Sequence, residues 1–66
     1  MIVALTHLDH TGTVLHCAHI LLAEAERQVR YGCGDPLCHI HTVAGRIDGR
    51  WHVRSYPAPV IEEEGL

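Results

Sequence analysis

The clearest structural signal in the chain lies at residues 40–56, IHTVAGRIDGRWHVRSY. Two runs rich in β-branched and aromatic residues flank Asp48-Gly49, a dipeptide that favours a two-residue turn between antiparallel strands. We therefore predict a β-hairpin with strands at residues 40–47 and 50–56. The hairpin register sets three cross-strand pairs on one face: Trp51 with Arg46, Val53 with Ala44, and Ser55 with Thr42.

The two faces of this hairpin differ in their chemistry. The three pairs, together with Ile40, form an apolar face that we expect to pack against a helix. The opposite face carries Arg50, His52 and Arg54 beside Val43 and Ile47. Gly45 leaves a second register open, because a glycine within a strand often marks a bulge.

Apolar residues recur at alternating spacings of three and four ahead of the hairpin, as on one face of an amphipathic helix. They are Leu15, Ala18, Leu22, Ala25 and Val29. Strong helix formers dominate this stretch, and Gly32 follows it as a C-terminal cap would. We predict a helix over residues 14–31 with Thr13 as its N-cap. The alternative is a later start near Ala18, with residues 13–17 as the second strand of an N-terminal hairpin.

The two ends of the chain complete the expected fold. Residues 2–8, IVALTHL, predict a short strand, and residues 9–12, DHTG, predict a turn. Pro57 and Pro59 end the sheet, and residues 60–66 form an acidic tail. The expected fold is a single α+β domain at residues 1–59, with an N-terminal strand or hairpin, one amphipathic helix and a C-terminal β-hairpin.

The chain is too short to rely on a large apolar core. It has 66 residues with no Phe and one Trp, and a domain of this size buries only about 60% of its unfolded surface. Seven His and three Cys indicate a bound metal ion as added support, with self-association as the competing source of stability. An odd number of Cys cannot close into intrachain disulfides, and no signal peptide or membrane span is evident, so we expect a cytoplasmic protein with reduced thiols.

The spacing Cys33-x4-Cys38-x2-His41 allows one loop to wrap an ion, and thiolate and imidazole are ligands that zinc prefers. We predict a zinc site at these three residues, with His39 or His52 as the fourth ligand. Cys17 cannot share an ion with Cys33, because a helix over residues 18–31 separates them by about 20 Å. A second Cys/His group lies before or at the start of the helix: His7, His10, His16, Cys17 and His19. The interpretation without metal is that the cysteines are small core residues and the histidines polar surface residues.

No zinc-enzyme motif such as HExxH is present, so we expect a protein that is not an enzyme. The predicted function is a regulatory binding or adaptor module, supported by zinc, that contacts another protein or a second copy of itself. The alternative is a transcriptional regulator that binds nucleic acid through the hairpin residues Arg46, Arg50, His52 and Arg54. The net charge of −3 disfavours this alternative, because phosphate binding relies on basic surfaces. No membrane partner is expected.

Overall fold

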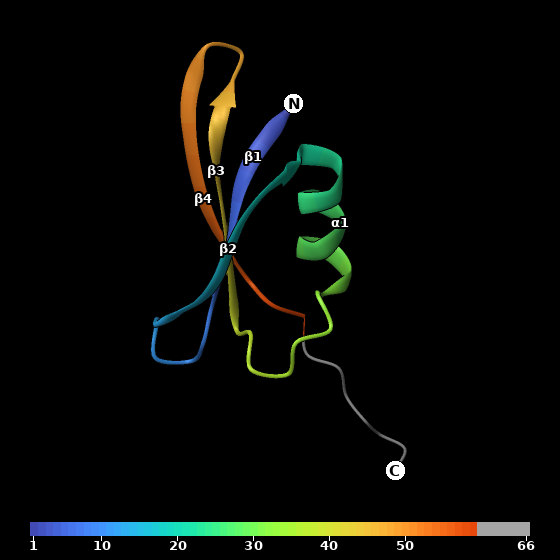
Figure 1. Cartoon of the computed structure of the whole chain (residues 1–66), viewed down its shortest axis with the longest axis vertical. Helices are drawn as coiled ribbons and strands as arrows, with labels where there is room; N and C mark the ends of the chain where they lie inside the picture. Colours follow the sequence, from blue (N-terminus) through green and yellow to red (C-terminus); the bar gives the residue numbers. More distant parts are fainter. Residues whose placement is uncertain (60–66) are drawn as a thin grey trace.

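The computed structural model describes residues 1–59 and has the predicted α+β fold: a four-stranded antiparallel sheet with one helix (Figure 1). The strands are β1 (Ile2–Leu8), β2 (Val14–Leu21), β3 (Ile40–Ile47) and β4 (Arg50–Pro57), and the helix is α1 (Leu22–Tyr31). Their spatial order is β2-β1-β3-β4, so the two hairpins lie side by side and β1 pairs with β3 across the centre. The acidic tail at residues 60–66 lies outside the described residues.

The predicted helix over residues 14–31 is wrong in its first half, and the alternative with an N-terminal hairpin is the nearer description. Residues 14–21 form β2, and the helix begins only at Leu22. Ala18 fits both patterns, since it also alternates with His16 and Ile20 along a strand. Pairing with the whole length of β1 therefore overrides local helix propensity.

Thr13 belongs to the β1–β2 turn and does not cap the helix. The Asp9 carboxylate accepts hydrogen bonds from the Thr11 and Thr13 backbone amides and from the Thr11 hydroxyl. Gly12 completes the turn with a φ of 87°, a conformation that glycine adopts without strain. At the other end, Gly32 follows α1 as predicted, and its amide donates to the Gln28 carbonyl.

The β3–β4 hairpin has the predicted register. Trp51 pairs with Arg46, Val53 with Ala44, and Ser55 with Thr42. Gly45 makes no bulge and pairs regularly with His52. A Cβ at residue 45 would lie 2.8 Å from the Val3 Cγ1, so the absence of a side chain allows this close approach to β1.

The helix packs on the opposite face of the sheet from the one predicted. It lies against β1 and β2, over the face that holds Val3 and Leu5, and these side chains with Ala25 form the buried core. On β4, Trp51 and Val53 point away from the helix and are 71% and 66% exposed. Side chains alternate between the two faces of a strand, so the pattern separates the faces but does not say which one the helix covers.

We call the uncovered side the open face. It comprises Ile2, Ala4, Thr6, Cys17, His19, Leu21, Ile40, Thr42, Ala44, Arg46, Trp51, Val53 and Ser55. The other side, the helix face, carries the core and the candidate site. Within residues 1–59, no helix is long and apolar enough to cross a membrane.

Candidate metal centre

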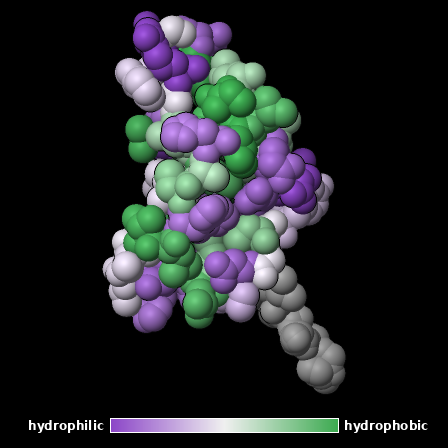
Figure 2. All heavy atoms as spheres, in the orientation of Figure 1, coloured by the Kyte–Doolittle hydropathy of each residue, from purple (hydrophilic) through white to green (hydrophobic). Residues whose placement is uncertain are grey.

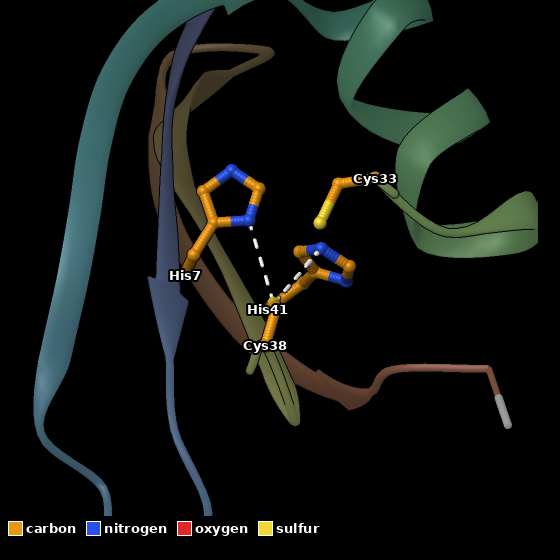
Figure 3. A group of neighbouring side chains, drawn as sticks. All are labelled: His7, Cys33, Cys38 and His41. Atoms are coloured by element: carbon orange, nitrogen blue, oxygen red, sulfur yellow. Dashed lines mark hydrogen bonds between the residues drawn. The ribbon is translucent and has the colours of Figure 1, made fainter. Parts of the chain in front are cut away.

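Four side chains from three parts of the fold converge beside the end of α1 (Figure 3). His7 lies on β1 and His41 lies directly opposite it on β3. Cys33 follows the helix, and Cys38 precedes β3. Figure 3 shows the Cys33 thiol reaching from the end of the helix toward the two imidazole rings. The group thus joins the sheet to the segment that connects helix and sheet.

The distances between the donor atoms are close to those of a tetrahedral metal site. One nitrogen or sulfur from each residue lies within 4.8 Å of all the others. The Cys38 Sγ lies 3.4 Å from the His7 Nδ1 and 3.4 Å from the His41 Nε2. Zinc bonds of 2.0–2.3 Å arranged as a tetrahedron place neighbouring ligand atoms about 3.3–3.8 Å apart. The group therefore needs only a small contraction to enclose such an ion.

Local sequence explains how the loop presents both cysteines on the same side. Gly32 and Gly34 have φ values of 94° and 85°, so the chain can reverse direction sharply on either side of Cys33. Asp35 then forms a turn in which its carboxylate accepts from the Leu37 amide and its carbonyl accepts from the Cys38 amide. These turns return Cys38 to the group that contains Cys33.

Burial keeps the imidazoles of the group in the form that binds metal. His7 is 8% exposed and His41 is fully buried. Desolvation lowers the pKa of His7, with a smaller contribution in the same direction from His16, and it lowers the pKa of His41, with His7 as the smaller cause. Both rings are therefore neutral at neutral pH, and each offers a nitrogen lone pair.

Cys38 is a neutral thiol when no ion is bound. Burial, followed by the neighbouring Cys33, raises the pKa of Cys38 to about 11. A metal ion must therefore displace the thiol proton on binding, which makes affinity dependent on pH. Two thiolates and two neutral imidazoles would balance the charge of a divalent ion, so the donor set fits zinc.

The surrounding protein satisfies the His41 imidazole poorly. The His41 Nδ1 is buried and has no hydrogen-bond partner among the described residues. Leaving a buried polar atom unpaired costs about 1–3 kcal/mol. The opposite ring nitrogen has only the weak Cys38 thiol contact at 3.4 Å. A bond from the Nε2 to an ion would give this nitrogen a stronger interaction than the thiol does, while the Nδ1 would stay unpaired.

The structure brings together three of the five residues predicted as ligands. Cys33, Cys38 and His41 belong to the group, and the fourth donor is His7. Neither His39 nor His52 takes that place, which corrects the expected fourth ligand. His39 lies before β3, exposed, with its ring 5.6 Å from that of His10. His52 pairs with Gly45, whereas the partner of His41 on β4 is Tyr56.

The sequence analysis placed His7 in a separate Cys/His group and not with His41, because His41 lies 34 positions further along the chain. Only the pairing of β1 with β3 places His7 beside His41, and a single sequence gives no direct sign of that pairing. One signal was present: His7 alternates with Val3 and Leu5, so it belongs to the buried face of an apolar strand. A histidine in such a position calls for a partner.

The other Cys/His residues that precede the helix in the sequence lie outside the candidate metal centre. Cys17 is exposed on the open face, where its sulfur accepts a hydrogen bond from the Thr6 hydroxyl. His16 lies next to His7, with ring centroids 5.5 Å apart, but is not one of the four. His19 lies on the open face, opposite Ala4.

Three of the four cationic residues proposed for nucleic acid, Arg50, His52 and Arg54, share one face of β4, as predicted, and Arg46 lies on the other face of the sheet. Arg46 lies on the open face, where its guanidinium donates to the Gly49 carbonyl in the β3–β4 turn. His52 and Arg54 lie on the helix face, where they line a hollow of about 430 Å³ between α1 and the β3–β4 hairpin. Arg50, opposite Ile47, belongs to that second face.

Comparison with known proteins adds no relative to this picture. The chain matches no protein-family model, no curated protein and no solved structure. Its function must therefore be argued from the site and the surface.

Proposed function

We propose that the chain is a small binding module, without enzymatic activity, whose fold is supported by one zinc ion held by His7, Cys33, Cys38 and His41. The observation that carries this proposal is the convergence of two thiols and two imidazoles within 4.8 Å. Three of these residues come from separate segments of the chain: the end of α1, the loop before β3, and β1.

A structural role for the ion fits the donor count and the burial. Structural zinc sites have four protein ligands, whereas catalytic zinc sites keep one position open for water or substrate. Three of the four residues are buried, and Cys33 is partly buried. A four-ligand site in this position would join helix, loop and sheet without offering a reactive position.

The binding role is supported by the surface that remains uncovered. One helix covers only part of one face of a four-stranded sheet, so both the open face and the hollow beside β3 and β4 present apolar side chains. Exposed apolar surface of this extent is typical of sites of protein–protein contact.

Zinc titration of the chelator-treated full chain tests the proposal. We expect circular dichroism to show the fold forming as zinc is added, with saturation at one ion per chain in native mass spectrometry. Cys38→Ser should abolish this zinc-dependent folding, whereas Cys17→Ser, the matched change at an exposed cysteine outside the group, should leave it intact. A chain that is equally folded with and without chelator, and that holds no ion, would contradict the proposal.

A further inference from the structure

We infer that the open face is the contact surface of a symmetric dimer of this chain, in which two sheets pack face to face. This inference deepens the proposed function, because it names a second copy as the partner and rests on that binding role.

The residue pattern of the open face suits burial. Large apolar side chains lie at the end near the β3–β4 turn, where Ile2 and Leu21 are each 56% exposed and Trp51 is 71% exposed. The next row has the small side chains of Ala4 and Ala44 at its centre, with His19 at one end and Val53 at the other. Figure 2 shows hydrophobic groups gathered at the end of the sheet where β2 passes into α1.

Four side chains of this face form two hydrogen-bonded pairs, which lowers the cost of removing them from water. The Thr42 and Ser55 hydroxyls lie 3.0 Å apart, and the Thr6 hydroxyl donates to the Cys17 sulfur at 3.3 Å. Buried polar groups that keep a hydrogen bond cost far less than unpaired ones. These two pairs form a row across the sheet that could enter an interface intact.

The charges of the open face favour an identical partner over an oppositely charged one. Arg46 is its one formally charged residue, and that guanidinium is turned to the Gly49 carbonyl at the end of the sheet. Two copies related by a two-fold axis across the strands would place their Arg46 side chains at opposite ends of the interface. A strongly acidic or basic partner would find almost no complementary charge here.

The size of the face meets the requirement of a weak dimer. Strands about 4.8 Å apart with a rise of about 3.3 Å per residue give four strands a footprint of roughly 20 by 25 Å. This footprint is about 500 Å² on each copy if the face is treated as flat. The total buried area is then near about 1,000 Å², the lower limit for a specific interface. Sheets in face-to-face contact pack about 10 Å apart with interleaved side chains, which Trp51 and Val53 are placed to provide.

Sedimentation velocity of the zinc-loaded full chain over a range of concentrations tests the inference. We expect a reversible monomer–dimer equilibrium, and a blue shift of the emission of Trp51, the sole tryptophan, as the dimer forms. Val53→Lys should weaken dimerisation at least tenfold, because it buries an unpaired charge in the interface. The matched control is Tyr31→Lys on α1, at a side chain of nearly equal exposure (67% against 66%), which should dimerise like the unmodified chain.

Zinc content and circular dichroism of all three proteins separate this inference from the proposed metal centre. A folded chain with one zinc ion that stays monomeric up to about millimolar concentration would overturn the dimer and leave the metal centre standing. Equal dimerisation of Val53→Lys and Tyr31→Lys would also overturn it, because the contact would then lie elsewhere. A dimer without zinc would instead contradict the metal centre.

Discussion

The two faces of the sheet are built from the same four strands, yet they present opposite chemistry. The helix face holds the most buried side chains of the described chain, including Val3, Leu5 and the fully buried His41. The open face leaves Trp51 and Val53 mostly exposed. Alternation along each strand creates this division, but the position of α1 decides which face becomes the core.

A metal ion at the four-residue group would add a link that the short helix lacks. The helix has ten residues, and only Ala25 is buried along it. Apolar contact alone gives such a short helix little to hold it against the sheet. Ligands at Cys33 and Cys38 would fix the segment that follows the helix to His7 and His41 on the central strands. All four ligands would come from the helix face and the loop beside it, and none from the open face.

The largest expected effect comes from removing a ligand on the helix face. His41→Ala should leave the chain unfolded at zinc concentrations that saturate the unmodified protein, because the ion loses a ligand and the core gains a cavity. His39→Ala, a change at an exposed histidine outside the group, should retain both zinc and fold. Zinc content and circular dichroism are measured for both variants. If the two variants bind zinc and fold equally well, His41 is not a ligand that the fold depends on.

Acidification should lower the stability of the folded chain through the two histidines of the helix face. Burial lowers the pKa values of His7 and His41 below 6.5, so the folded chain binds fewer protons than the unfolded chain. Their contribution to stability is therefore complete above about pH 6.5 and is lost as the pH falls below it. Protonation of the imidazoles also opposes zinc binding. We expect zinc release and unfolding together in a pH titration followed by a zinc indicator and circular dichroism; unchanged zinc retention at pH 4.5 would contradict this account.

Truncation of a core residue should separate the two faces in free energy. Leu5, which is 1% exposed on the helix face, should lose about 2–5 kcal/mol of unfolding free energy on substitution by Ala. Val53→Ala on the open face should change the unfolding free energy of the monomer by less than about 0.5 kcal/mol. Urea denaturation of the zinc-loaded protein compares the two variants, at protein concentrations too low for dimers to form. Similar losses of unfolding free energy would mean that Val53 is buried in the monomer, which would contradict an uncovered open face.

A smaller effect is expected where β1 and β3 meet most closely. Gly45→Ala would place its Cβ 2.8 Å from the Val3 Cγ1, so the two strands must shift apart. Overpacking of this kind costs about 1–3 kcal/mol. The measurement is again urea denaturation with zinc present, and a stabilised variant would show that the close approach is not rigid.

Local signals predicted much of this fold. Asp48-Gly49 specified the β3–β4 hairpin and its register, and Gly32 marked the end of the helix. The start of the helix could not be predicted from local pattern, because Ala18 fits a strand and a helix equally well. The sequence also could not predict which face of the hairpin the helix covers, because both faces carry apolar residues. Only the packing of the N-terminal hairpin decides between them.

The candidate metal centre was likewise predictable only in part. Cys33, Cys38 and His41 are close in sequence, so their spacing suggested a common site. His7 comes from the first strand and reaches the group only through the antiparallel pairing of β1 with β3. The expected fourth ligands were His39 and His52, but His39 lies outside the strand, and His52 pairs with Gly45, four residues along β3 from His41.

The central claim is that His7, Cys33, Cys38 and His41 together hold one ion. Replacing zinc by Co²⁺ in the full chain tests it directly, because the visible spectrum of Co²⁺ reports both tetrahedral geometry and thiolate ligands. We predict one Co²⁺ per chain with intense tetrahedral bands and sulfur charge transfer, which zinc displaces and which His7→Ala weakens or abolishes while His10→Ala leaves them unchanged. A spectrum of weak octahedral bands, or one that is the same in both variants, would contradict the account.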